Sequence, residues 1–148
     1  MTYQEILKQY WGYDNFRGIQ EDIIQSVGKG QDTLGLMPTG GGKSLTYQLA
    51  AMLQPGVTVI IDPLKSLMED QYDGLINVGI DCCTFINSGL SKEEKDANEL
   101  KMEQSQVIFN HIFKQKAKFN QHYYFSIIEL LCCYSSITEL LFVIMHIF

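Results

Sequence analysis

The sequence lacks the cysteine spacing that marks a zinc-binding or disulfide-stabilised domain. Its four cysteines form two adjacent pairs, and no two of them have the Cys-x-x-Cys spacing. The three histidines are scattered along the second half of the chain and do not stand at metal-ligand spacing. We therefore expect reduced structural thiols and no zinc site at Cys82, Cys83, Cys132 and Cys133.

An excess of positive charge is also missing, as is a targeting segment. The formal net charge is −6 at pH 7, which argues against a protein that binds nucleic acid over its whole surface. A local cluster of hydrogen-bond donors can still hold a phosphate backbone on an acidic chain. The first residues contain no basic stretch followed by an apolar run, so we expect neither a signal peptide nor a transit peptide, and a cytoplasmic location.

Glycine and proline are absent from the last third of the chain. All twelve glycines and all three prolines lie between Gly12 and Gly89. Because glycine and proline make turns and close backbone approaches, their absence indicates that a different kind of segment begins. We place the boundary at residue 108, with one domain over residues 1–108 and an apolar tail, expected to be helical, over residues 109–148.

Before that boundary the pattern alternates between strands and helices. A helix is predicted to end at Gly28-Lys29-Gly30, and a second to begin near Ser44. Short apolar runs predict strands at residues 33–37, 57–61, 83–86 and 106–109, and Ser91 is expected to cap a charged helix. This alternation predicts an α/β domain with a parallel sheet and flanking helices.

A glycine-rich loop, Met37-Pro-Thr-Gly-Gly-Gly-Lys-Ser44, joins the first predicted strand to the next helix. Consecutive glycines let successive backbone N–H groups face the oxygens of a phosphate, and the helix N-terminus adds its dipole. In such a loop the lysine reaches the β and γ phosphates and the serine hydroxyl ligates Mg²⁺. The loop predicts a nucleotide site with Mg²⁺ that involves Thr39, Gly40, Gly41, Gly42, Lys43 and Ser44.

A second segment upstream predicts which nucleotide is bound. Tyr13 and Arg17 offer flat surfaces that can stack on a purine, by aromatic and guanidinium stacking. The Gln20 amide offers a donor and an acceptor side by side, which matches the N6 and N7 edge of adenine. Taken singly, each of these residues has an ordinary structural explanation, but together they favour ATP.

These segments, with Leu45-Thr-Tyr-Gln-Leu49 and Asp62-Pro-Leu-Lys-Ser-Leu-Met-Glu-Asp-Gln71, resemble the start of a RecQ-family ATP-dependent DNA helicase, a superfamily 2 motor. The resemblance covers about two thirds of the chain and implies part of a RecA-like P-loop domain. It also implies contacts with single-stranded or forked DNA, and DNA unwinding in recombination and repair by intact members. The residues it assigns to the DNA backbone are Pro63, Lys65, Ser66, Asn87 and Ser88.

The acidic pair that such motors use to activate water is not found here, because the 148 residues contain no Asp-Glu dipeptide. We therefore expect a truncated chain that binds ATP weakly and does not unwind DNA alone. Three interpretations of the tail remain open: a segment from a shifted reading frame or an unrelated join, a membrane anchor over residues 126–148, or an amphipathic helix that covers an exposed sheet edge or docks a partner. In each case self-association through the apolar tail is a risk.

Two other classes of function remain open from the residues alone. One is an interaction protein that keeps the nucleotide fold but has lost catalysis. The other is a complete small P-loop ATPase or kinase, which would turn over ATP without DNA.

Overall fold

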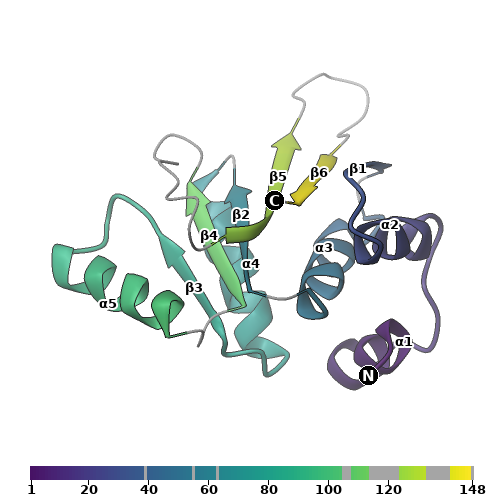
Figure 1. Ribbon diagram of the computed structural model, residues 1–148, viewed down its shortest axis with the longest axis horizontal. Coiled ribbons are helices and arrows are strands. Elements are labelled where there is room, and N and C mark those ends of the chain that lie inside the picture. The colour runs from purple at the N-terminus through teal and green to yellow at the C-terminus, as the bar shows by residue number, and fades with distance from the viewer. Residues whose placement is uncertain are drawn as a thin grey trace.

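The computed structural model describes residues 1–38, 40–54, 56–62, 64–104, 108–113, 124–132 and 141–147. Six strands form one sheet, with short helices between the first ones (Figure 1). The helical segments are α1 Tyr3–Ile6, the π-helix η1 Leu7–Trp11, α2 Gln20–Gly28, α3 Lys43–Met52, α4 Lys65–Asn77 and α5 Lys92–Glu103. The strands are β1 Thr33–Met37, β2 Val57–Asp62, β3 Cys83–Ile86, β4 Phe109–Phe113, β5 Tyr124–Cys132 and β6 Leu141–Ile147.

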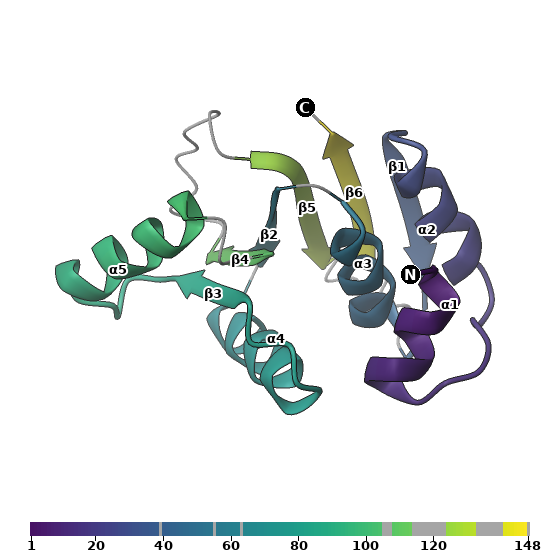
Figure 2. The same cartoon turned by 60° about the horizontal axis from the view of Figure 1, so that its bottom comes forward.

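The order of strands in the sheet is β1-β6-β5-β2-β4-β3. Strands β5, β2, β4 and β3 pair in parallel, whereas β6 pairs antiparallel with both β5 and β1. The parallel sheet expected from the sequence is therefore interrupted by one strand of the opposite direction. Helices α3 and α4 both lie below the sheet in Figure 1, and Figure 2 shows α1 and α2 beside α3.

The predicted elements before residue 108 are largely confirmed. Strands form over the predicted segments at β1, β2 and β3, and α2 ends at Gly28, followed by Gly30 at a φ of 73°. Ser91 caps α5 with a capping box, in which its hydroxyl accepts from the Glu94 N–H and the Glu94 carboxylate accepts from the Ser91 N–H. The fourth strand begins later than predicted, at Phe109, and residues 105–107 lie outside the described part of the chain.

The expectation of a helical tail is wrong. Where the structure describes the tail, it has the strands β4, β5 and β6, and all three belong to the same sheet as β1–β3. The physical reason is pairing: β2 is flanked by β4 and β5, so the buried run of β2 receives hydrogen bonds from both sides. The apolar segments of residues 124–132 and 141–147 therefore form two separate strands, and they do not form one apolar helix.

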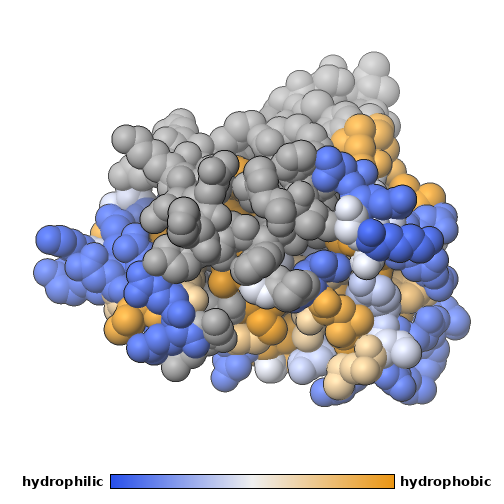
Figure 3. Space-filling view, in the orientation of Figure 1, coloured by the Kyte–Doolittle hydropathy of each residue, from blue (hydrophilic) through white to orange (hydrophobic). Residues whose placement is uncertain are grey.

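The main core lies between α1–α4 and the sheet. Its fully buried side chains include Ile24, Tyr47, Leu49, Ile60 and Phe109. Phe109 is the first residue of the predicted tail, so the core includes a side chain from beyond the boundary at residue 108. Figure 3 shows the α5 end of the molecule as mostly hydrophilic, which agrees with the charged sequence of that helix.

No helix among the described residues is both long enough and apolar enough to cross a bilayer.

Candidate nucleotide site

The N-terminal segment contains a short π-helix, whose two ends line a cavity. The capping box of Thr2 and Glu5 starts α1, and the chain then continues as the π-helix η1 up to Trp11. Gly12 ends it in the left-handed conformation, with a φ of 74°. A single turn of π-helix shifts the side chains that follow it and is often found at functional sites. Here both ends of η1, Leu7 and Trp11, line a cavity.

Tyr13 and Arg17 lie close together at one end of this cavity. The guanidinium carbon of Arg17 is 5.2 Å from the centre of the Tyr13 ring, which is within the range of a cation–π contact. Both side chains are exposed and both line the cavity. A flat cation over an aromatic face is a surface on which a purine can stack.

Gln20, by contrast, is buried, with 4% of its surface exposed. Its Oε1 accepts a hydrogen bond of 2.8 Å from the Arg17 backbone N–H. Its Nε2 donates to the carbonyl oxygens of Gly41 and Gly42, each at 3.2 Å. Gln20 therefore links the Tyr13–Arg17 segment to the glycine-rich loop, a contact that the sequence did not indicate.

The glycine-rich loop leads from β1 into α3, as predicted. Gly40 and Gly42 have φ angles of 74° and 78°, which L side chains rarely adopt. The Gly41 N–H donates to the Pro38 carbonyl at 3.0 Å, and Gly42 is the N-cap of α3. Thr39 lies outside the described residues. The first turn of α3 carries no acidic side chain, so its N-terminus is electrostatically open to an anion.

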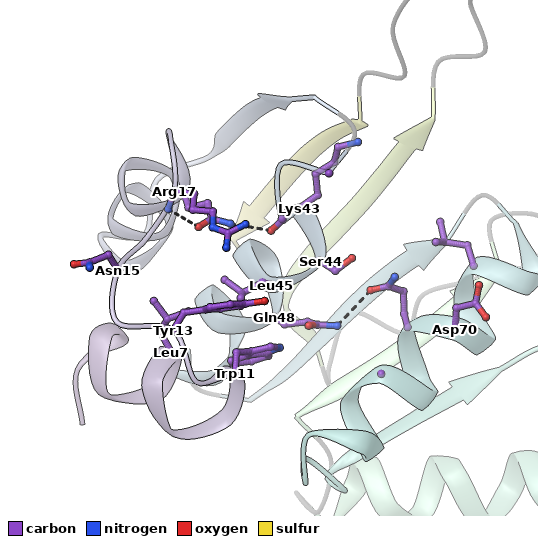
Figure 4. Close-up of a pocket in the computed structure, with 16 residues that line it drawn as sticks. Leu7, Trp11, Tyr13, Asn15, Arg17, Lys43, Ser44, Leu45, Gln48 and Asp70 are labelled. Atoms are coloured by element: carbon purple, nitrogen blue, oxygen red, sulfur yellow. Dashed lines mark hydrogen bonds between the residues drawn. The ribbon is translucent and has the colours of Figure 1, made fainter.

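The two predicted halves of the site share one cavity of about 620 Å³. Figure 4 shows Lys43 and Ser44 projecting from the start of α3, with Tyr13 and Trp11 toward its other end. Of the residues predicted to bind nucleotide, those lining the cavity are Tyr13, Arg17, Gln20, Gly40, Gly42, Lys43 and Ser44. Gly41 does not line it, but its carbonyl receives the Gln20 amide.

Helix α4 forms the opposite wall, which the sequence did not indicate. Leu67, Asp70, Gln71 and Gly74 line the cavity from this helix. Gln71 Oε1 accepts a hydrogen bond from Gln48 Nε2 at 3.3 Å (Figure 4). It also accepts one from the Tyr47 hydroxyl at 2.7 Å. These bonds hold α4 against α3. A helical spacing in the sequence says which face is apolar, but it does not say which distant helix that face meets.

Trp11 also lines the cavity and had no role predicted from the sequence. It is the only tryptophan of the chain and lies half-buried in the cavity. Its place as the last residue of η1 is the signal that could have drawn attention to it, but a π-helical turn is not readable from residue types.

Magnesium could be held at this site by the Ser44 hydroxyl together with phosphate oxygens and water. Mg²⁺ keeps several waters and needs only one or two protein ligands when phosphates are present. Ser44 lines the same cavity as Lys43, so the residues fit a metal that arrives with a nucleotide. Among the described residues, no group of three His, Cys, Asp or Glu side chains could hold a metal ion by itself.

The segments predicted to contact DNA lie near each other, outside this cavity. Lys65 and Ser66 begin α4, and Asn87 and Ser88 follow β3. A β-carbon placed on Gly89 would be 3.5 Å from Lys65 Nζ, so the two segments meet. Pro63 lies outside the described residues.

Within this pair of segments the side chains differ in exposure. Lys65, Ser66 and Ser88 are exposed, whereas Asn87 is buried and its Oδ1 accepts from the Gly89 N–H at 2.7 Å. Asn87 thus shapes the turn, whereas Lys65, Ser66 and Ser88 are exposed to solvent. Lys65 Nζ also lies 3.7 Å from Glu69 on the next turn of α4.

Comparison with known proteins indicates the family to which the chain belongs. The family model described as DEAD/DEAH box helicase matches residues 17–130. That match begins at Arg17 and extends beyond the predicted boundary at residue 108.

Individual relatives carry a more specific description. The chain is 39% identical over 113 residues to the probable ATP-dependent DNA helicase RecS of Bacillus subtilis, covering 76% of this chain and 21% of the relative. It is 38% identical over 122 residues to the ATP-dependent DNA helicase RecQ of Haemophilus influenzae, covering 82% and 20%. It is 50% identical over 97 residues to the RecQ-like DNA helicase blm-1 of Caenorhabditis elegans, covering 65% and 10%. The chain thus spans about a fifth or less of the length of these relatives.

Proposed function

Because the chain belongs to the DEAD/DEAH box helicase family, with RecQ helicases among its relatives, we propose that its cavity binds ATP together with Mg²⁺. The observation that carries this proposal is the shared cavity. It places the Tyr13–Arg17 stack and the phosphate loop with Lys43 and Ser44 around one space of about 620 Å³. Surfaces that suit a purine and groups that suit phosphates thus face the same space.

Each part of the site has a distinct role in this proposal. The N-terminal amides of α3 and the Lys43 ammonium hold the phosphates, and Ser44 orients Mg²⁺. Tyr13 and Arg17 stack on the purine, and Trp11 closes the cavity beside them. Gln20 stands at the junction between the base end and the phosphate end.

The test is a titration of Mg²⁺ and ATP followed by calorimetry and by the fluorescence of Trp11. Because Trp11 is the chain's only tryptophan and lines the cavity, its signal reports on this site alone. We expect saturable binding by the wild type and at least a tenfold loss in Lys43→Ala, since an ammonium–phosphate bond contributes about 1.5–3 kcal/mol. Lys29→Ala, at the exposed end of α2, is the matched control. Equal affinities for the wild type and Lys43→Ala would contradict the proposal.

We also propose that the exposed residues Lys65, Ser66 and Ser88 contact the backbone of single-stranded DNA. The support is their convergence at the Gly89 turn, combined with the printed description of the relatives as DNA helicases. Lysine and serine side chains are typical donors to phosphate oxygens. Self-association through the apolar tail stays a prediction.

Hydrolysis is a separate question from binding. The chain has no Asp-Glu pair that could activate the attacking water, and we propose that it binds ATP without turning it over or unwinding DNA by itself. This is the point at which an interaction protein that has lost catalysis differs from a small ATPase. Phosphate release from ATP, measured with and without single-stranded DNA, tests it: turnover above the level of Lys43→Ala in either assay would favour an ATPase.

A further inference from the structure

Two glutamine side chains on facing walls of the cavity form a pair that still has free hydrogen-bonding groups. Gln48 of α3 and Gln71 of α4 both line the cavity, and Gln48 Nε2 donates to Gln71 Oε1 at 3.3 Å. The Tyr47 hydroxyl donates to the same oxygen at 2.7 Å, so both lone pairs of Gln71 Oε1 are in use. Within the part of the chain that the structure describes, nothing bonds to Gln48 Oε1 or to Gln71 Nε2. The pair therefore presents one unused acceptor and one unused amino group.

The unused oxygen of Gln48 belongs to a side chain that is almost fully buried, with 5% of its surface exposed. A buried amide oxygen without a partner costs free energy, and buried polar groups in folded proteins are therefore nearly always hydrogen-bonded. Because Gln48 lines the cavity, the missing partner is an atom that occupies this space.

The character of the pair does not depend on how the two amides are turned. Turning both of them over would exchange the two unused groups but would again leave one carbonyl and one amino group. Turning only one would bring two oxygens or two amino groups face to face, which is unfavourable. The wall formed by Gln48 and Gln71 is thus neutral, and it both donates and accepts hydrogen bonds.

This combination identifies the kind of ligand group that fits the wall. A phosphate oxygen is repelled by a carbonyl oxygen, and it has better partners at Lys43 and the N-terminus of α3. A hydroxyl group can donate and accept, so it matches a carbonyl beside an amino group. With the purine assigned to Tyr13 and Arg17, the remaining polar part of a nucleotide is the ribose, which has two adjacent hydroxyls.

The position of Gln48 suits a sugar that joins the base to the phosphates. Gln48 follows Ser44 by about one turn of α3, or about 6 Å along the helix axis, and lies on the same helix face. In the view of Figure 4 it lies between Trp11 and Ser44, and all three residues line the cavity.

We propose that Gln48 and Gln71 form a subsite for the sugar, in which Gln48 Oε1 accepts from one ribose hydroxyl and Gln71 Nε2 donates to the other. This inference rests on the proposed nucleotide site. It makes the cavity selective for a ribonucleotide over a nucleotide that lacks both hydroxyls. Because one glutamine is on α3 and the other on α4, the sugar bridges the two helices.

ATP and 2′,3′-dideoxy-ATP separate the reading of the sugar from the binding of base and phosphates, because they differ only in the two hydroxyls. The experiment is calorimetric titration of each nucleotide, with Mg²⁺, into the wild type and Gln48→Met, a neutral variant of similar length without the amide. We expect the wild type to bind ATP about tenfold more tightly than the dideoxy analogue, and Gln48→Met to bind both with nearly equal affinity.

The matched control is Gln54→Met, which should keep the preference for ATP. Gln54 follows α3, is half-buried, donates to the Val27 carbonyl at 3.5 Å and does not line the cavity. If Gln48→Met does not fold, as judged by circular dichroism, Gln71→Met removes the amino group at a half-buried position and should lose the same preference.

The outcomes are distinct. A wild type that binds both nucleotides equally would overturn the proposal, as would a preference for ATP that survives in Gln48→Met or, where that variant does not fold, in Gln71→Met. Loss of the preference in Gln54→Met would also overturn it, because a general loosening around α3 would then explain the effect. A wild type that binds neither nucleotide would instead contradict the proposed function itself.

Discussion

The guanidinium carbon of Arg17 lies 5.2 Å from the centre of the Tyr13 ring, and both side chains line the cavity that Lys43 also lines. Arg17 is also the only arginine of the chain. Its planar group can stack on a base, whereas a lysine of equal charge cannot. The same residue holds Gln20 through its backbone N–H, so its side chain and its main chain serve different parts of the site.

Replacing Arg17 by lysine should therefore weaken the binding of ATP more than the binding of inorganic tripolyphosphate. The backbone bond to Gln20 remains, and only the stacking surface is lost. We expect the Kd for ATP to rise about three- to tenfold, from a stacking contribution of about 0.5–1.5 kcal/mol. The Kd for tripolyphosphate, which has the phosphates but no base to stack, should not change when it is measured by calorimetry. A parallel rise for both ligands would mean that Arg17 acts as a charge on the phosphates.

Three glycines should respond differently to alanine. Gly40→Ala should cost about 1–2 kcal/mol of the free energy of unfolding, because its φ of 74° is left-handed but the space around it is open. Gly42→Ala should cost more, since it adds a collision with Gln20 Nε2 to a φ of 78°. Gly74→Ala, inside α4 with nothing within 4 Å, should stabilise the fold by up to about 1 kcal/mol.

Urea unfolding followed by circular dichroism measures all three variants. Equal losses for Gly40→Ala and Gly42→Ala would show that the Gln20 side chain moves aside without cost and that its bonds to the Gly41 and Gly42 carbonyls add little to stability.

Lys65→Ala should reduce the affinity for single-stranded DNA and its dependence on salt. For single strands, the loss of one phosphate contact makes the negative slope of log Kobs against log salt less steep by about 0.7. Fluorescence anisotropy of a labelled oligonucleotide at several salt concentrations gives both values. The control is Lys101→Ala, on the last turn of α5. If Lys101→Ala changes the slope as much as Lys65→Ala does, binding is a general charge effect and not a contact at the Gly89 turn.

Cys83 should make the fold less stable in alkali. Burial, with smaller contributions from Cys82 and Asp81, raises the pKa of the Cys83 thiol from 9.0 to about 12. Between these values the unfolded chain loses this proton while the folded chain keeps it, so the free energy of unfolding falls as the pH rises. Below pH 9 the thiol is neutral in both states and this loss is absent.

The comparison with Cys83→Ala isolates the effect, because burial also raises the pKa of Tyr3 and Tyr72. Urea unfolding at a series of pH values should show a steeper alkaline decline in the wild type than in the variant. Identical declines in the two proteins would place the alkaline sensitivity elsewhere.

Local patterns were enough to predict most elements before residue 108, but not α1 or the π-helix η1. The continuous run of β2, the cap at Ser91 and the glycines after β1 each depend on neighbours within a few residues. Short apolar runs of the tail carry no such signal, since a buried strand and a buried helix turn have the same composition. The choice between them is made by the partner strand, as when β5 pairs with β2.

The site divides in the same way. The position of the glycine-rich loop between β1 and α3 was predictable, because it depends on residue types at fixed spacing, and that the loop and the Tyr13–Arg17 segment bind a nucleotide stays a prediction. The bond between Gln20 and the glycine carbonyls was not, because it depends on the direction of backbone groups more than twenty residues away. The Gln71 contacts of α4 are hidden from the sequence for the same reason.

The strand that leads into the glycine-rich loop depends for its pairing on a remote part of the chain. Among the described strands, β1 pairs only with β6, so that Thr33 lies opposite Met145 and Met37 opposite Leu141. Contacts between such distant residues form slowly, because a long loop must close first. During biosynthesis, the ladder beside the glycine-rich loop can therefore be completed only after β6 has left the ribosome, so this edge of the sheet is among the last parts of the protein to mature.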